Sequence, residues 1–164
     1  MSVYGRILLA GLGSLALLLG AFGFQHLGAL MPCPMCIWQR WPHAIAVVLS
    51  IGAMTLLWRF RRPVAAVAAV VVASGAGIGF FHAGVEQRWW QGPSSCTAPD
   101  PSALSTDELL AQIQNAPAVA CDEIAWEFLG LSMAGWNALI SLGLALLWVF
   151  AALPKTTTRH IAPT

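Results

Sequence analysis

The chain has 164 residues, of which 58% are hydrophobic and only 9% are charged. Charged residues make up about a quarter of an average soluble domain, so this composition excludes an ordinary soluble protein and indicates an integral membrane protein. The net charge is only +1. No cluster of basic residues alternates with aromatic ones, which excludes a nucleic-acid-binding face.

The apolar residues fall into four stretches that predict an all-α membrane protein, a four-transmembrane-helix bundle forming a single domain over residues 1–164. A membrane-spanning helix needs about 20 residues. We expect spans at about residues 7–26, 38–58, 64–82 and 131–153. The second span needs a start near Trp38 to cross the roughly 30 Å hydrocarbon core, which leaves Pro42 inside it; a start at Pro42 is the alternative.

The distribution of charge predicts how the bundle is oriented. Six of the eight basic residues lie at the termini or in the turn between the second and third spans: Arg6, Arg59, Arg61, Arg62, Lys155 and Arg159. The positive-inside rule therefore places both termini and the tail at residues 154–164 in the cytoplasm. All four cysteines then lie on the outer side.

The long hydrophilic segment at residues 86–130 is expected to be an outer loop. Several prolines in its first half disfavour regular structure. The sequence from Ser105 to Glu108 has the spacing of a capping box, which predicts a short amphipathic helix from Thr106 to about Gln114. Cys96 and Cys121 flank this expected helix.

Cys33 and Cys36 form a Cys-x-x-Cys pair at the outer end of the second span. Such a pair closes too small a loop to stabilise a fold but suits thiol exchange, and Arg40, one helical turn further on, would favour a thiolate. Ile37 after the second cysteine argues against haem attachment, and a four-thiolate zinc site needs two close pairs, so no metal is predicted. The alternatives are two structural disulfides, with Arg40 as an anchor at the membrane edge.

Several motifs together resemble the DsbB family of bacterial inner-membrane thiol oxidoreductases. They are Phe24-Gln25-His26, Pro32-Cys33-x-x-Cys36 with Arg40, the loop cysteines Cys96 and Cys121, and Trp126-x-Phe128-Leu129-Gly130-Leu131-x-Met133-x-x-Trp136. The resemblance implies a multi-pass protein of the bacterial inner membrane with its cysteines in the periplasm. It also implies reoxidation of a periplasmic thioredoxin-fold oxidase of the DsbA type and electron transfer to a quinone, either ubiquinone or menaquinone.

The resemblance implies a role for each of five residues. Cys96 matches the loop cysteine that the partner's thiolate attacks, and Cys121 matches its loop mate, which exchanges with the membrane-edge pair. Cys33 matches the cysteine that receives the electrons, and Cys36 the one facing the quinone. Arg40 matches the arginine that supports quinone reduction, since a guanidinium stabilises developing negative charge.

Three further residues are candidates for quinone contact, namely His82, His26 and Trp38. The alternative for each is a polar or aromatic residue of the membrane interface, and His43 is a weaker candidate of the same kind. Gln39 departs from the family pattern, because an acidic residue is expected before the arginine.

Three other functions remain open at this point. A DsbI-like relative would serve a dedicated oxidase, and an enzyme similar to vitamin K epoxide reductase would also combine a four-helix bundle with two cysteine pairs. A non-catalytic tetraspan scaffold would use its cysteines as structural disulfides.

Overall fold

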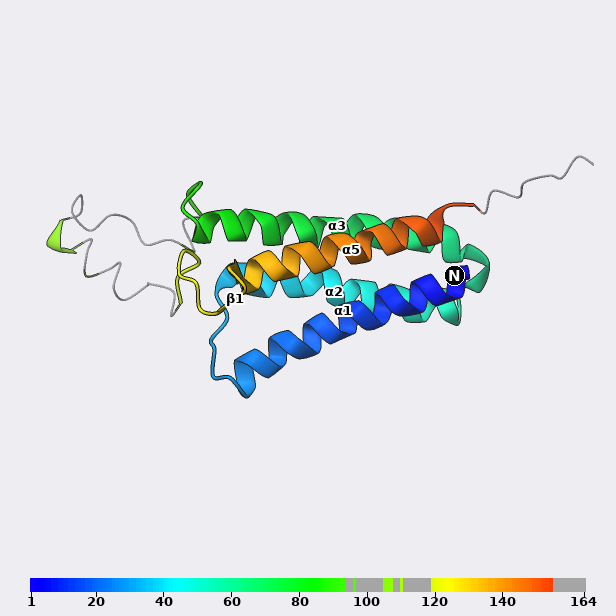
Figure 1. Ribbon diagram of the computed structural model, residues 1–164, viewed down its shortest axis with the longest axis horizontal. Helices are drawn as coiled ribbons and strands as arrows, with labels where there is room; N and C mark the ends of the chain where they lie inside the picture. The colour runs from blue at the N-terminus through cyan, green and yellow to red at the C-terminus, as the bar shows by residue number, and fades with distance from the viewer. Residues whose placement is uncertain (94–95, 97–104, 108–109, 111–118, 155–164) are drawn as a thin grey trace, which may run out of the picture.

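The computed structural model describes residues 1–93, 96, 105–107, 110 and 119–154. Within them, four long helices run side by side, each antiparallel to the helices it packs against: α1 (Val3–His26), α2 (Pro34–Met54), α3 (Arg61–Glu86) and α5 (Met133–Ala152) (Figure 1). A short 3₁₀ helix, η1 (Trp58–Phe60), joins α2 to α3. Each helix packs against two neighbours, in the order α1, α2, α3, α5 and back to α1.

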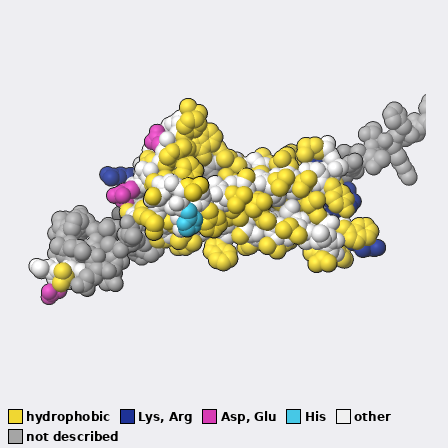
Figure 2. All heavy atoms as spheres, turned by 90° about the horizontal axis from the view of Figure 1, so that it is seen from below, with side chains coloured by type: hydrophobic (Ala, Val, Ile, Leu, Met, Phe, Trp, Pro, Cys, Tyr) yellow, Lys and Arg dark blue, Asp and Glu magenta, His cyan; other side chains and the backbone are white. Residues whose placement is uncertain are grey.

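Three segments are long and apolar enough to cross a membrane: α1, the segment Trp58–Glu86 that contains α3, and α5. This confirms a mostly helical, multi-pass membrane protein. The fourth long helix, α2, is not among these segments, and its first half carries the polar residues Gln39, Arg40 and His43. Hydrophobic side chains cover much of the length of the molecule on the face shown in Figure 2, as expected of a surface that faces lipid.

The observed α2 begins at Pro34, about one turn before the expected start near Trp38, and ends at Met54 rather than at residue 58. Its early start has a local cause. Cys33 is the N-cap residue, its sulfur accepts a hydrogen bond from the backbone N–H of Cys36, and proline is favoured at the first helical position.

Pro42 lies inside α2, where its ring packs closely against Gly75 of α3. A proline inside a helix removes one backbone hydrogen bond, which neighbouring helices in a membrane protein can compensate. The helix therefore continues through this residue.

The observed α3 is longer than the expected third span at both ends, since it begins at Arg61 and ends at Glu86 whereas the expected span covers residues 64–82.

The start of α1 and the end of α5 meet at one end of the bundle, where the Arg6 guanidinium donates a hydrogen bond to the Phe150 carbonyl (Figure 1). Arg61 lies over the Tyr4 ring there, with its guanidinium carbon 4.8 Å from the ring centroid. On the face shown in Figure 2, most of the basic side chains lie at this end, whereas the acidic side chains lie toward the other end together with one basic group. The two ends of the bundle therefore differ in charge.

A β-hairpin not predicted from the sequence precedes α5. Strands β1 (Glu127–Phe128) and β2 (Leu131–Ser132) are antiparallel. Leu129 and Gly130 form the turn with φ of 52° and 75°, and two positive values are typical of a two-residue type I′ turn. The Trp136 indole N–H donates to the Phe128 carbonyl and ties the hairpin to α5.

The amphipathic helix expected from Thr106 to Gln114 lies for the most part outside the described residues, so it stays a prediction. The expected tail at residues 155–164 lies entirely outside them.

Two glycines of α3 allow a test of how closely it packs against α5. A Cβ atom added to Gly79 would lie 3.1 Å from the backbone nitrogen of Ala138, whereas among the described residues nothing lies within 4 Å of one added to Gly77. Gly79→Val should destabilise the protein by about 1–3 kcal/mol through overpacking. Thermal unfolding in detergent should show a clear loss for Gly79→Val and little change for Gly77→Val. Equal losses would contradict the close α3–α5 contact.

Candidate functional site

The four cysteines meet at the end of the bundle opposite the chain termini. Cys33 caps α2 and Cys36 lies in its first turn, while Cys96 and Cys121 come from the segment between α3 and α5. The Cys121 backbone N–H donates to the Cys96 carbonyl at 2.9 Å. Cys33, Cys96 and Cys121 are buried together with Met35 and Val85 in a small core. The structure thus brings together all four cysteines that the sequence singled out.

The sulfur atoms form a continuous series. Cys33 Sγ lies 2.9 Å from Cys36 Sγ and donates a hydrogen bond to it. The Cys121 thiol forms hydrogen bonds with both Cys96 and Cys33. The order is therefore Cys96, Cys121, Cys33, Cys36. Neighbouring thiols at hydrogen-bond distance are placed for disulfide exchange, because exchange requires one sulfur to attack the next.

Burial makes the middle thiols of this series hard to ionise. It raises the pKa of Cys121 to about 12. The pKa of Cys33 is also raised, first by the hydrogen bond it donates to Cys36 and second by burial. The backbone N–H of Cys36, 3.2 Å from Cys33 Sγ, acts in the opposite direction, since a hydrogen bond to a thiolate stabilises it. Reaction at these sulfurs therefore depends on the hydrogen-bond donors around them.

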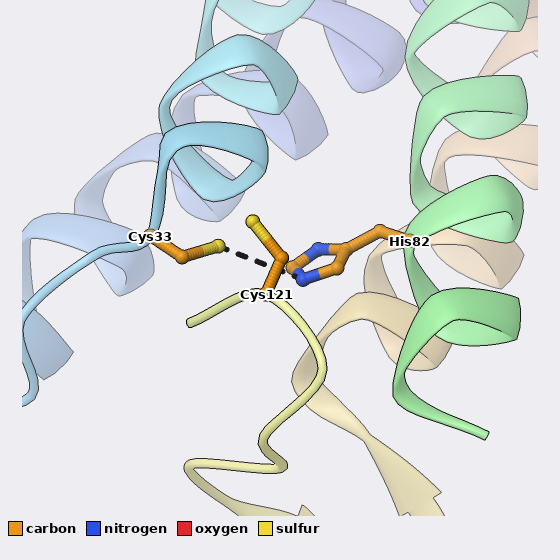
Figure 3. Close-up of side chains that lie close together, drawn as sticks. All are labelled: Cys33, His82 and Cys121. Carbon is orange, nitrogen blue, oxygen red and sulfur yellow. Dashed lines mark hydrogen bonds between the residues drawn. The ribbon is translucent and has the colours of Figure 1, made fainter. Parts of the chain in front are cut away.

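His82 of α3 reaches into the series of sulfurs. Its Nε2 lies 3.5 Å from Cys33 Sγ, and Figure 3 shows its ring pointing at Cys33 beside Cys121. The backbone of Cys121 also forms a hydrogen bond with His82, and Glu86 Oε1 lies 3.9 Å from Nε2. Cys33 Sγ, Cys121 Sγ and His82 Nε2 lie within 4.8 Å of one another, close enough for one metal ion to contact all three.

A buried polar network continues from His82 into the bundle. His82 Nδ1 lies 2.8 Å from Gln39 Nε2, and Asn137 Nδ2 donates to Gln39 Oε1 at 2.6 Å. One turn deeper, His43 Nε2 lies 3.1 Å from Ser141 Oγ. Gln39, His43 and His82 are all almost fully buried. Polar side chains within an apolar bundle are costly, so such a network marks a candidate functional site.

An apolar cavity of about 420 Å³ lies beside the cysteine pair of α2. Its walls come from all four long helices and from the segment that leads into α5, and α1 diverges from the bundle at this end (Figure 1). The polar or reactive groups of the lining include Cys33, Cys36, Arg40, His82 and Glu86. A mainly apolar cavity of this size with a few convergent polar groups is typical of a site for a small organic molecule.

Arg40 is held at the cavity by α1. It donates a hydrogen bond to Gln25 Oε1 at 2.6 Å, and its guanidinium carbon lies 4.9 Å from the centroid of the Phe22 ring. Its Nε is buried and has no hydrogen-bond partner among the described residues. A buried donor without a partner is unfavourable, so this N–H is available to a ligand that brings an acceptor.

The other two candidates for ligand contact are placed differently. His26 is exposed at the end of α1, where it stacks on Phe22, and Trp38 is 44% exposed on the outside of α2. Of the described residues that line the cavity, Arg40, His82 and Cys36 are among those singled out from the sequence, whereas His26 and Trp38 are not part of the lining.

Sequence reasoning missed the roles of Gln39, Glu86 and Asn137. Glu86 and Asn137 line the same cavity, and Gln39 lines it while binding His82. The signal was present as polar residues at a spacing of four on two otherwise apolar helices, Gln39 with His43 and Asn137 with Ser141. Residues four apart lie on the same helix face.

The contact between Cys121 and Cys33 can be tested without any partner. A Cys36→Ser/Cys96→Ser variant retains these two thiols, and diamide should join them in a disulfide detectable by peptide mapping. The control, Cys33→Ser/Cys121→Ser, retains the two ends of the series and should react at least about tenfold more slowly. Because burial raises the pKa of Cys121 to about 12, its thiolate fraction and the rate should rise about tenfold per unit between pH 7 and 9. Equal rates for both variants would contradict the order of the sulfurs.

Comparison with known proteins identifies the family of this chain. The family model described as "Disulfide bond formation protein DsbB" matches residues 5–151. The chain is 30% identical over 162 residues to a Disulfide bond formation protein B of Stutzerimonas stutzeri, covering 90% of this chain and 93% of the relative. It is 36% identical over 160 residues to that of Xanthomonas oryzae pv. oryzae, covering 92% and 90%, and 32% identical over 164 residues to that of Marinobacter nauticus, covering 96% and 94%. The chain therefore belongs to the DsbB family of membrane disulfide bond formation proteins.

Proposed function

We propose that this protein oxidises the dithiol of a periplasmic thioredoxin-fold oxidase of the DsbA type and passes the electrons to a membrane quinone. The observation that carries the proposal is the series Cys96, Cys121, Cys33, Cys36, which leads from the segment between α3 and α5 to a cavity lined by Cys36 and Arg40. Family membership supports the oxidoreductase activity.

The first exchange takes place at the loop pair, which begins as a Cys96–Cys121 disulfide. A thiolate of the partner attacks Cys96, forms a mixed disulfide and releases Cys121 as a thiolate. The second thiolate of the partner then displaces Cys96, so that the partner leaves oxidised and the loop pair reduced. Two electrons have then moved from the partner to Cys96 and Cys121.

The second exchange moves these electrons to the membrane-edge pair. The Cys121 thiolate attacks Cys33 of the Cys33–Cys36 disulfide, forms a Cys121–Cys33 bond and releases Cys36 as a thiolate. Cys96 then attacks Cys121, which restores the loop disulfide and releases Cys33. The hydrogen-bonded contacts of Cys121 with Cys96 and Cys33 support this sequence, because both attacks join sulfurs that are already neighbours.

The residues around the cavity fit a quinone. Quinones carry carbonyl oxygens on an apolar ring, and the buried Nε of Arg40 lacks a partner among the described residues in a cavity that is otherwise mainly apolar. Arg40 and Cys36 would hold the ring, with His82 at the edge of the same cavity. A bound quinone would accept two electrons and two protons. Arg40 supplies a fixed positive charge where negative charge develops.

The proposal includes four membrane spans, with α2 as the fourth. This helix packs between α1 and α3 and has 21 residues, a length similar to that of α5. The end of the bundle that carries Arg6, Arg59, Arg61 and Arg62 faces the cytoplasm, in accord with the positive-inside rule, and the cysteines face the periplasm of a bacterial inner membrane.

The function is tested with purified protein in membrane vesicles that contain ubiquinone or menaquinone. A reduced thioredoxin-fold oxidase added to vesicles with the periplasmic face outward should be oxidised with loss of one quinone per partner disulfide, measured by quinone absorbance. Inverted vesicles should show no reaction until they are permeabilised. A Cys36→Ser variant is the control for background oxidation. Absence of partner-dependent quinone loss in permeabilised vesicles would contradict the proposal.

Arg40→Ala separates quinone reduction from thiol exchange. Removal of one preorganised donor for developing charge commonly lowers the rate by about 100-fold or more, so we expect at least a tenfold loss of quinone-dependent turnover. Oxidation of one equivalent of partner without quinone should keep its rate. The matched control is Arg88→Gln, an arginine at the same end of the bundle that is exposed and outside the cavity lining. Equal loss of both activities in Arg40→Ala would indicate a structural role.

A further inference from the structure

The orientation of the Gln39 side chain is fixed by its neighbours. Its Nε2 lies 3.2 Å from the backbone carbonyl oxygen of Met35, which can only accept a hydrogen bond, so this atom is the amide nitrogen. Its Oε1 accepts from the Asn137 amide nitrogen at 2.6 Å. The second hydrogen of the same Gln39 nitrogen then points to His82 Nδ1, 2.8 Å away.

This arrangement determines which nitrogen of His82 carries the proton. A neutral imidazole has one N–H and one lone pair, and Nδ1 must offer its lone pair to the Gln39 amide. The proton therefore sits on Nε2, the nitrogen that faces Cys33 Sγ at 3.5 Å. The groups around this N–H are the Cys33 sulfur, Cys121 and the carboxylate of Glu86. The α5 neighbour of the network, Asn137, is uncharged.

The same assignment argues against a metal ion at this cluster. Cys33, Cys121 and His82 could contact one ion, but a histidine ligand needs its lone pair on the nitrogen that faces the ion. Here the nitrogen that faces the two sulfurs is the protonated one. The cluster therefore suits a hydrogen bond from the His82 Nε2–H to the Cys33 sulfur.

We propose that Gln39, supported by Asn137, is a positioning residue that holds His82 in the tautomer whose Nε2–H donates to Cys33 Sγ, and that this hydrogen bond stabilises the Cys33 thiolate. The proposal deepens the function proposed above and rests on it for its place in the reaction. Its physical basis, the tautomer and the thiolate, is independent of any partner or quinone.

The thiolate is needed when the loop pair is restored. The Cys96 thiolate attacks Cys121, the Cys96–Cys121 bond forms, the Cys121–Cys33 bond breaks, and the electron pair of the broken bond stays on Cys33 Sγ. No proton has to move in this step. Cys33 is only 2% exposed, so water does not solvate the charge that appears on it. The Cys36 backbone N–H and the His82 Nε2–H take the place of water.

The test uses the full chain with Cys33 as its single cysteine, in a Cys36→Ala/Cys96→Ala/Cys121→Ala background. The pH dependence of alkylation by iodoacetamide in detergent reports the pKa of the Cys33 thiol. Gln39→Met and His82→Phe should each raise this pKa by about one unit, since a hydrogen bond to a charged group is worth about 1.5–3 kcal/mol. The matched control is Ser50→Ala, a buried polar residue of α2 outside this network, whose hydroxyl donates to the Ile7 carbonyl of α1.

The tautomer is measured separately on the reduced chain with all its cysteines. Two-bond ¹H–¹⁵N spectra of protein with labelled histidine should show His82 protonated on Nε2, and Gln39→Met should shift population toward Nδ1. A proton on Nδ1 in the unsubstituted chain would overturn the proposal. This measurement needs no variant, so it decides the question even if Gln39→Met fails to fold. The proposal would also be overturned if Gln39→Met left the Cys33 pKa unchanged, or if Ser50→Ala raised that pKa equally. Because neither readout involves quinone turnover, failure of the proposed function would show in the vesicle assay alone.

Discussion

The contact between Cys121 and Cys33 is the interaction on which the site depends. It joins a loop cysteine to the N-cap of α2, across 87 intervening positions of the chain. Without it the chain holds two separate cysteine pairs, each able to form a disulfide and neither able to pass electrons to the other. The shared burial of Cys33, Cys96 and Cys121 with Met35 and Val85 maintains the contact, because separating them would expose that small core to water.

The polar network behind the sulfurs shows how an apolar bundle accommodates reactive groups. Gln39, His82 and Asn137 come from three different helices and are joined by hydrogen bonds through Gln39, and among the described residues none of their side-chain nitrogen or oxygen atoms is buried without a partner. Arg40 is different, because one of its donors stays without a partner among the described residues and faces a mainly apolar cavity. Glu86 Oε2 and His43 Nδ1 are likewise buried without a hydrogen-bond partner among the described residues, so three polar groups of the cavity lining are open to a ligand.

The cavity follows from how α1 is placed. Gly11 of α1 lies directly against Ser50 of α2 near one end of the bundle, where an added Cβ would collide with the serine side chain. Toward the other end α1 diverges (Figure 1), and Phe22 and Gln25 hold Arg40 across the gap between α1 and α2. Close packing at the end that carries the termini and divergence at the end that carries the cysteines leave a cavity beside Cys33 and Cys36.

The sequence by itself determined the class of protein, the helical architecture and the family, because hydropathy over about 20 residues and the cysteine motifs are local signals. It also identified Arg40 and His82, which the structure brings to the cavity, but it equally identified His26 and Trp38, which lie on exposed surface. The resemblance to the family already implied the order Cys96, Cys121, Cys33, Cys36, whereas only the tertiary structure decided which sulfurs contact one another and the tautomer-determining contacts of Gln39. Those depend on distances between residues of different helices, and a pattern along one chain segment contains no information about such distances.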